Sequence, residues 1–325
     1  MNFNDKKVIL FDRPITVLSL CDGMSCGQIA LQKAGIEVEK YYASEIKDIA
    51  IKVTKHNFPN TIHIGDVRKV SYSNGYLKTE FGNFQTDIDI VIFGSPCQSF
   101  SIAMKKDKRT GLKDKEKSGL FLECYRILKE VNPTYFLMEN VSSMNDSDRD
   151  YISGLLGVQP IRINSKCVSP VLRDRLYWTN IPNVSIPSDI DIKLQDILTD
   201  GYTNREKGRA LLVSDSRPPT TPVKMFHRYY YKGFGNLVFK DREHFEKCAD
   251  YYDKNYRGLK AKDIPTDETN IFNGIRYLNQ RELERCQTVP IGYTDCLTRN
   301  EAADVLGDGW TIDVILHILK NLKEV

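Results

Sequence analysis

Residues 15–34 read ITVLSLCDGMSCGQIALQKA, and they contain the pattern from which the fold can be predicted. The β-rich run Thr16–Leu20 predicts a strand, the polar turn after it contains Asp22 and Gly23, and Cys26–Ala34 has the apolar spacing of a helix. The same succession of strand, polar turn and helix recurs through the first 180 residues. Because such alternation implies crossover connections, the sequence predicts an α/β fold with a doubly wound, mostly parallel sheet and helices on both faces.

The ends of the predicted strands carry polar residues. Strands are expected at Thr16–Leu20, Glu37–Ser44, Ile88–Gly94, Tyr135–Glu139, Pro160–Ile163 and Leu176–Thr179, and helical patterns at Cys26–Ala34, Lys47–Asn57, Gly119–Val131, Asn279–Gln287 and Thr311–Lys323. Four strands run directly into polar turns, which are Cys21-Asp22-Gly23, Ser44-Glu45, Ser95-Pro96-Cys97 and Glu139-Asn140. Ligands of open α/β sheets bind beyond the carboxyl ends of the strands, so we expect these turns to line one crevice.

The character of the sequence changes after about Ile181. Crossover periodicity is lost, prolines gather, and aromatic and basic side chains cluster at His227–Lys232. We therefore expect a larger domain formed by residues 1–180 and 273–325, and a smaller, irregular domain at residues 181–272.

Composition and charge narrow the class of protein. Of the 325 residues, 41% are hydrophobic and 27% are charged, which is typical of globular domains. The net charge is only +3, so a polyanionic partner has to be argued from local charge. No apolar run approaches the roughly 20 residues of a membrane helix, and the first residues lack a signal-peptide core. We expect a cytoplasmic protein with no membrane partner.

Among the eight cysteines, Cys97 is the candidate nucleophile. No pair has Cys-x-x-Cys spacing and the five histidines show no metal-ligand spacing, so we expect reduced thiols and no metal. Cys97 follows the most hydrophobic strand, Ile88–Phe93. A free thiol has a pKa of about 8.5, so only a few per cent is thiolate at neutral pH. The signatures of a cysteine protease and of a zinc deaminase are both missing around it.

The turn after the first strand suggests a nucleoside site. A dinucleotide fingerprint needs G-x-G-x-x-G, and only two of its glycines can be matched here. Glu45 lies 23 residues after Asp22 at the end of the second strand, where an acid typically binds ribose hydroxyls. A nucleoside ligand without a pyrophosphate fits both facts, and S-adenosylmethionine is the commonest. A plain βα turn followed by a surface glutamate is the alternative.

Three further residues suggest a substrate. Glu139 ends an apolar strand, and Arg173 and Arg175 precede another. Each alone is more often a structural polar residue, but methylation of cytosine requires such a carboxyl group and such a cation together with a thiolate. Its carbon 5 accepts a methyl group only after a thiolate adds to carbon 6. That addition needs a carboxyl group at ring nitrogen 3 and a cation at oxygen 2.

With these residues in order, the chain resembles the DNA cytosine-5 methyltransferases over nearly its whole length, above all the mammalian de novo enzymes and their bacterial and phage relatives. The resemblance rests on Asp22-Gly23-x-x-x-Gly27, Ser44-Glu45-Ile46, Gly65-Asp66-Val67, Pro96-Cys97, Glu139-Asn140-Val141, Arg173-x-Arg175, Arg281–Gln287 with Pro290 and Tyr293-Thr294, and Gly307-Asp308-Gly309-Trp310. It implies a Rossmann-like S-adenosylmethionine-dependent catalytic domain and a target-recognition domain at residues 181–272. The implied reaction is methyl transfer to carbon 5 of cytosine in double-stranded DNA, after the base is flipped out.

The resemblance also implies roles for individual residues. Catalysis is implied for Cys97, Glu139, Arg173 and Arg175, and contacts to S-adenosylmethionine or its product S-adenosylhomocysteine for Cys21, Asp22, Gly23, Gly27, Glu45, Ile46, Asp66, Val67, Pro96, Leu120, Asp308, Gly309 and Trp310. Three positions depart from the family pattern. Cys21 replaces an aromatic residue that stacks on the donor, Asp308 stands where many members have asparagine, and Val171 replaces a glutamine.

Two other functions stay open. A tRNA cytosine-5 methyltransferase of the same superfamily is expected to carry a Cys-Phe-Thr element, which this sequence lacks. A catalytically silent DNA-binding regulator is disfavoured by the intact Cys97, Glu139 and Arg175. Base contacts are expected from residues such as Arg217, Thr220, Thr221, Arg228 and Lys232, and phosphate contacts from the basic segment 105–117. A companion restriction endonuclease, in a prokaryotic cell or a phage, would be a fitting partner.

Overall fold

The computed structural model describes residue 11 and residues 13–96, 100, 110–114, 119–265 and 269–323. The chain divides into two compact units, each with a hydrophobic core of its own. Unit 1 is Met1–Asn164, Asp174–Pro187 and Ile312–Val325, and unit 2 is Ser165–Arg173 and Ser188–Thr311. These bounds describe how the chain packs. The expected division into a catalytic domain and a recognition domain, with boundaries near residues 180 and 273, stays a proposal.

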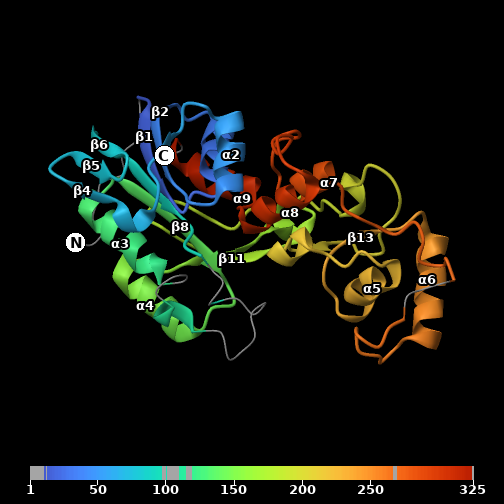
Figure 1. Cartoon of the computed structure of the whole chain (residues 1–325). Helices are drawn as coiled ribbons and strands as arrows, with labels where there is room; N and C mark the ends of the chain where they lie inside the picture. The colour runs from blue at the N-terminus through green and yellow to red at the C-terminus, as the bar shows by residue number, and fades with distance from the viewer. Residues whose placement is uncertain are drawn as a thin grey trace. The chain divides into compact units, whose positions relative to one another are not determined.

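Unit 1 is built on a sheet of order β3-β2-β1-β7-β8-β11-β9 (Figure 1). Its strands are β1 Ile15–Leu20, β2 Val38–Ser44, β3 Ile62–His63, β7 Ile90–Phe93, β8 Tyr135–Val141, β9 Ile161–Asn164 and β11 Asp174–Thr179. Neighbours from β3 to β8 pair in parallel, and β11 runs antiparallel to both β8 and β9. The predicted α/β fold with a mostly parallel sheet is therefore confirmed.

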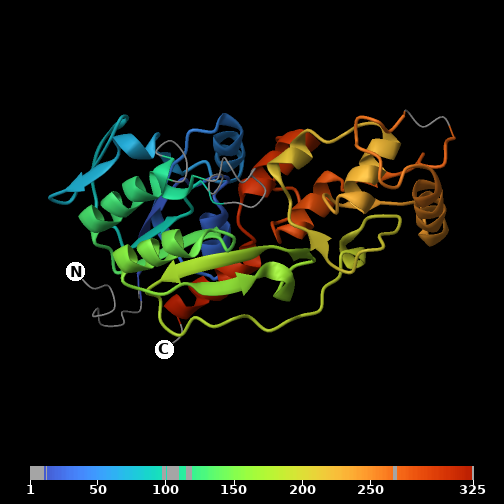
Figure 2. The same ribbon diagram turned by 90° about the horizontal axis from the view of Figure 1, so that it is seen from below.

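Helices cover both faces of this sheet. They are α1 Cys26–Lys33, α2 Asp48–Asn57, α3 Leu120–Val131, α4 Asp146–Leu156 and α9 Ile312–Leu319. Chain order runs from β1 to β3 in one direction and from β7 to β8 in the other. Since crossover connections are right-handed, the reversal puts α1 and α2 on one face and α3 on the other. Helix α9 packs against α1, and Figures 1 and 2 show α4 beside α3. Ligands of such sheets bind where the chain order reverses, here between β1 and β7.

Between β3 and β7 the chain forms a small antiparallel meander that the sequence patterns above did not predict. Its strands are β4 Ser71–Ser73, β5 Tyr76–Thr79 and β6 Gly82–Gln85. Asn74 and Gly75 join β4 to β5, and both have positive φ, at 53° and 77°. Fully buried Leu77 and partly buried Phe84 anchor the meander in the core of unit 1. The meander is thus an integral part of the unit.

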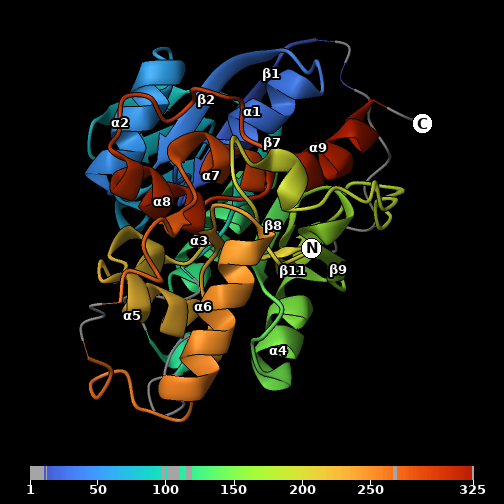
Figure 3. The same cartoon turned by 90° about the vertical axis from the view of Figure 1, so that its right-hand side faces the viewer.

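Unit 2 combines two short strand pairs and several helices with irregular segments. These are the strand pairs β10 Val171–Leu172 with β12 Gly208–Arg209 and β13 Leu237–Val238 with β14 Arg276–Tyr277, and the helices α5 Pro222–Phe226, α6 Arg242–Asn255, α7 Gln280–Cys286 and α8 Arg299–Asp308 (Figure 3). A π-helix, His227–Tyr231, follows α5. The core gathers aromatic rings around Phe226, which lies 5.3 Å from Phe272 and 5.5 Å from Tyr252 between ring centroids. Contacts between aromatic rings thus make up much of the core of unit 2.

Within the described ranges, no helix combines the length and the apolar character of a membrane span. The same part of the chain holds no group of three or more His, Cys, Asp and Glu side chains arranged to bind a metal ion.

Candidate active site

The turn after β1 is a strongly constrained piece of backbone. Cys21, Gly23 and Ser25 all have positive φ, at 54°, 60° and 59°. Only glycine adopts this region without cost, so Cys21 and Ser25 store backbone strain of the kind that clusters at functional sites. The thiol of Cys21 lies against that of Cys124 on α3, and this contact, with burial, raises the pKa of Cys124 well above its ordinary value.

Asp22 is the acidic group of this turn. Its carboxylate accepts a hydrogen bond from Tyr41 Oη at 2.8 Å and another from Ser25 Oγ. Burial raises the pKa of Asp22 to about 6, and nearby Glu45 adds to the rise, while hydrogen bonds from Ser19, Ser25 and Tyr41 act in the opposite direction. Asp22 therefore changes charge close to neutral pH.

Glu45 joins the turn after β1 to the turn after β2. Its Oε2 accepts the backbone N–H of Gly23 at 2.7 Å, and its Oε1 accepts those of Ile46 and Lys47, each at 2.8 Å. The carboxylate is only partly buried, and the neighbouring Ile46 side chain is 66% exposed. An acidic group and an apolar surface thus stand side by side at the end of β2.

The segment after β3 is hydrogen-bonded to the end of β2. Ser44 Oγ donates to the carbonyl of Gly65 at 2.7 Å. Asp66 accepts the N–H of Arg68 at 3.0 Å and pairs with its guanidinium at 2.6 Å, which lowers the pKa of Asp66. Val67 is buried. The ends of β1, β2 and β3 therefore form one hydrogen-bonded group.

Gly27 allows α1 to approach the sheet closely. A Cβ atom at this position would stand 2.2 Å from Cδ1 of Ile92 on β7 and 2.9 Å from Tyr41 Oη. Any larger residue would push on the tyrosine hydroxyl that holds Asp22. The observed contacts of Gly27 are thus packing contacts, and the role implied for it in donor binding stays a prediction.

The register of the sheet brings the predicted polar turns to one edge. Leu20 pairs with both Ser44 and Phe93, and Phe93 pairs with Met138. The segments that follow β1, β2, β7 and β8 therefore leave the sheet at the same end.

Glu139 and Arg175 meet at this edge. Because β11 runs antiparallel to β8, its first residues lie beside the carboxyl end of β8, and Arg175 pairs with Val141 while Tyr177 pairs with Glu139. Glu139 and Arg175 are then diagonal neighbours on one face of the sheet. Arg175 Nε lies 2.7 Å from Glu139 Oε1, and the two side chains are 15% and 10% exposed. A carboxyl group and a cation thus stand together.

Asn140 fixes the turn that leads to Cys97. It is fully buried, and its side-chain amide donates to the carbonyl and the hydroxyl of Ser95, at 3.2 and 3.1 Å. Cys97 itself lies outside the described residues, and Pro96 is the last residue described before it. Asn140 is a positioning residue that the sequence interpretation named in its motif but did not include among the site residues.

Arg173, predicted to act with Arg175, makes different contacts. It is buried in unit 2, and its guanidinium donates to the carbonyls of Gly307 at 3.1 Å and Gly309 at 2.7 Å. It therefore braces the backbone around Asp308, at the end of α8. Glu139 and Arg175 belong to unit 1, whereas Arg173 belongs to unit 2.

The remaining predicted donor contacts are distributed over both units. Leu120, the first residue of α3, packs partly buried against the core of unit 1, and Pro96 is also partly buried. In unit 2, Asp308 is exposed and Trp310 is partly buried. Thr311 Oγ1, one residue further on, donates to Gln287 Oε1 at 2.8 Å, which ties this segment to α7.

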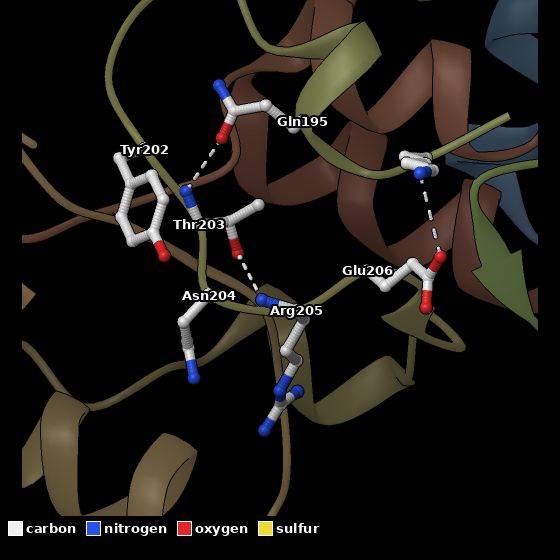
Figure 4. Close-up of a pocket in the computed structure, with 7 residues that line it drawn as sticks. Gln195, Tyr202, Thr203, Asn204, Arg205 and Glu206 are labelled. Carbon is white, nitrogen blue, oxygen red and sulfur yellow. Dashed lines mark hydrogen bonds and ion pairs between the residues drawn. The ribbon is translucent and has the colours of Figure 1, made fainter. Parts of the chain in front are cut away.

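Unit 2 holds a separate shallow cavity of about 360 Å³ (Figure 4). It is lined by Lys193, Gln195, Tyr202, Thr203, Asn204, Arg205 and Glu206. Gln195 accepts the N–H of Thr203 at 3.0 Å, and Arg205 donates to the carbonyls of Gly235 and Tyr229, at 2.5 and 2.9 Å. These bonds hold the loop around the cavity.

Arg228, a candidate for base contacts, is paired inside unit 2. Its guanidinium lies 2.9 Å from the carboxylate of buried Asp215, and its side chain is 17% exposed. Arg299 Nη1 donates to the backbone carbonyl of the same Asp215 at 3.0 Å. The pair therefore supports the 213–219 segment.

One group of polar residues lies at the ends of β1 to β3 and another at the ends of β7 and β8. Together with the doubly wound sheet, this arrangement defines a Rossmann-like methyltransferase fold. A crystal structure of a Spodoptera frugiperda DNMT2 mutant shares this fold with a TM-score of 0.66 and 20% identity, over 95% of this chain and 100% of that one. At this identity the likeness concerns the fold alone.

Sequence comparisons point in the same direction. Residues 15–154, somewhat less than half of the chain, match the family model of the C-5 cytosine-specific DNA methylases. It is 31% identical over 193 residues to the type II methyltransferase M.NgoBV of Neisseria gonorrhoeae, covering 53% of this chain and 42% of the relative. It is 30% identical over 202 residues to the orphan methyltransferase M.SPRI of Bacillus phage SPR, covering 58% and 43%. The matches thus span less than half the length of these two relatives.

Proposed function

We propose that this protein transfers a methyl group from S-adenosylmethionine to carbon 5 of cytosine in double-stranded DNA. The observation that carries the proposal is the Glu139–Arg175 pair, which lies at the carboxyl end of β8 near the Ser95-Pro96 turn, in a region that matches the family model of the C-5 cytosine-specific DNA methylases. Cytosine activation needs a carboxyl group and a cation in this proximity, beside a nucleophile.

The residues at the ends of β1, β2 and β3 fit the donor. Glu45 offers carboxylate oxygens to ribose hydroxyls, exposed Ile46 offers an apolar surface to the adenine, and Asp66 with Val67 borders the same region. Asp22 is an acidic group for the charged methionine end. S-adenosylmethionine supplies an electrophilic methyl group on a sulfonium ion. The resemblance also implies donor contacts for Cys21, Gly23, Pro96, Leu120, Asp308, Gly309 and Trp310, and these stay part of the proposal.

In the proposed mechanism, the Cys97 thiolate forms a bond to carbon 6 of the cytosine. Glu139 donates a proton or hydrogen bond at ring nitrogen 3, and Arg175 stabilises the charge at oxygen 2. Carbon 5 then takes the methyl group, its proton leaves to a base, and the bond between the thiol sulfur and carbon 6 breaks. Because this chemistry cannot occur inside a stacked duplex, the target base has to be flipped out, which costs a few kcal/mol.

The DNA is proposed to contact residues 181–272 as a recognition domain. Among the expected base-contacting residues, Arg228 is already paired with Asp215. The preferred candidates for base contacts are therefore Arg217, Thr220, Thr221 and Lys232. The relatives from a bacterium and a phage support a protein of a prokaryotic cell or a phage. We further propose a cytoplasmic location and, in a restriction–modification setting, a companion restriction endonuclease.

Bisulfite sequencing of DNA from cells that express the protein tests this function and reveals the recognition sequence. We expect methylated cytosines at a defined sequence, absent with a Cys97→Ser variant. Tritium transfer from labelled S-adenosylmethionine to tRNA, with none to duplex DNA, would favour the tRNA methyltransferase. Specific DNA binding without transfer to either substrate would favour the silent regulator.

Replacing Glu45 with alanine should weaken donor binding. A charge-assisted hydrogen bond contributes about 1.5–3 kcal/mol, which corresponds to roughly a 10- to 150-fold increase in Kd. Titration calorimetry with S-adenosylhomocysteine measures the change. Glu39→Ala, which alters an exposed glutamate on β2, the strand that ends directly before Glu45, serves as the control. Unchanged affinity in Glu45→Ala would exclude Glu45 as a donor contact.

Donor affinity should also depend on pH through Asp22. The pKa of this group is raised to about 6, so its charge is present above that pH and lost below it. If Asp22 pairs with the α-ammonium group at the amino-acid end of the donor, the Kd for S-adenosylhomocysteine should increase as the pH falls from 7.5 to 5, as calorimetry can measure. In Asp22→Asn this dependence should be much weaker. A wild-type profile as flat as that of the variant would refute the role.

Residues 105–117 should contribute to the salt dependence of DNA binding. The segment carries seven basic and three acidic side chains, a net charge of +4, and most of it lies outside the described residues. Each phosphate contact contributes about −0.9 to the slope of log affinity against log salt concentration. Changing Lys105, Lys106, Lys108 and Arg109 to Gln should flatten the slope by a few units in fluorescence anisotropy and leave sequence preference intact. An unaltered slope would mean that the segment does not contact phosphates.

A further inference from the structure

A turn of the meander reaches the segment after β3. Thr79 of β5 pairs with Gly82 of β6, so Glu80 and Phe81 form the turn between them. Oε1 of Glu80 accepts the backbone N–H of Asp66 at 3.1 Å. Oε2 of Glu80 lies 2.6 Å from Nζ of Lys69. The turn is therefore bonded to the segment that carries Asp66, a proposed donor contact.

Gly65 shows how closely this turn approaches. A Cβ atom at Gly65 would stand 2.2 Å from Glu80 Oε1 and 2.9 Å from the ring of Phe81, and the φ of 75° also favours glycine. On its other side, the carbonyl of Gly65 accepts the hydrogen bond from Ser44 Oγ. Gly65 is thus enclosed between the end of β2 and the β5–β6 turn.

The strands on either side of this turn, β5 and β6, are anchored by buried or partly buried side chains. Leu77 is fully buried, and the ring of Phe84 lies 5.4 Å from that of Tyr42 on β2. Phe81 nevertheless is 66% exposed, as is Ile46 after β2. Single exposed apolar residues are common. Phe81 differs from most because its ring borders Gly65, the residue directly before Asp66.

We propose that the β5–β6 turn is part of the donor site. Phe81 supplies an apolar face for the purine ring of the nucleoside, and Glu80 is a positioning residue that holds the backbone of Asp66. The inference rests on the proposed function, because it takes the adenine of S-adenosylmethionine to lie at Asp66. It adds that the meander forms one wall of the site for the adenine.

Four variants test the inference in the full-length protein: Phe81→Ala, Glu80→Ala, Glu80→Gln and the control Tyr76→Ala. Phe81→Ala should weaken binding of S-adenosylhomocysteine by about three- to tenfold in calorimetry, as expected for loss of an aromatic contact. Adenosine, which lacks the methionine end, should lose affinity by the same factor. The KM for S-adenosylmethionine should rise, while kcat at saturating donor stays at the wild-type value.

The glutamate variants separate positioning from general damage to the fold. Glu80→Ala should weaken donor binding, and Glu80→Gln should restore it, because the amide oxygen can still accept the N–H of Asp66. Tyr76 is an exposed aromatic residue at the other end of β5, so Tyr76→Ala should bind like the wild type. Unchanged affinity in Phe81→Ala, with wild-type protein that binds S-adenosylhomocysteine, would overturn this inference alone. Wild-type protein that does not bind S-adenosylhomocysteine would overturn the proposed function and the inference with it.

Discussion

Replacing Cys97 with serine is expected to abolish methyl transfer, with kcat lowered by roughly 10³-fold or more. A serine hydroxyl stays protonated at neutral pH and is a much weaker nucleophile than a thiolate, so the addition to carbon 6 fails. The buried amide of Asn140 holds Ser95, two residues before Cys97, which ties this turn to the strand that carries Glu139. Tritium transfer to duplex DNA under single-turnover conditions measures the loss.

Covalent trapping identifies the nucleophile directly. DNA with 5-fluorocytosine at the target should form a stable adduct with the wild type, because fluorine blocks the elimination that needs the proton of carbon 5. Cys97→Ser should form none. Cys167→Ser changes a partly exposed thiol in unit 2 and should trap like the wild type. An adduct that mass spectrometry maps to a different cysteine would refute the assignment of Cys97.

The sheet could be predicted from the sequence because its information is local. The apolar runs that end in polar turns correspond to β1, β2, β7 and β8, within a few residues at each end. Parallel strands place such turns at one edge, so the neighbouring positions of Asp22 and Glu45 followed from pattern alone. The Asn74-Gly75 pair was an equally local indication of a hairpin, and it was missed.

Contacts between distant parts of the sequence could not be predicted in the same way. Arg173 and Arg175 are two residues apart, yet only Arg175 lies in β11, where the register with β8 brings it to Glu139. Arg173 precedes the strand and bonds to carbonyls more than 130 residues away. Similarly, no sequence pattern indicates that Glu80 accepts the N–H of Asp66. Such side-chain contacts depend on the packing of the whole unit.

Glu139→Gln is the second variant expected to have a large effect. Loss of a general acid typically lowers the rate by roughly 10²- to 10⁴-fold, because an amide cannot deliver a proton to ring nitrogen 3. The fold should survive, since the amide oxygen of glutamine can still accept a hydrogen bond from Arg175 Nε, now 2.7 Å from Glu139 Oε1. Single-turnover rates of methyl transfer and the rate of 5-fluorocytosine trapping should therefore both fall, while the melting temperature stays close to that of the wild type.

The matched control lies on the neighbouring strand. Arg162 of β9 pairs with Asp174, but its side chain is 69% exposed, so Arg162→Gln should leave both rates at the wild-type level. Arg175→Gln should slow both, because it removes the cation proposed to act at oxygen 2. If Glu139→Gln transferred methyl groups at the wild-type rate while Arg175→Gln did not, the proton would come from another group, and Glu139 would serve only to orient Arg175.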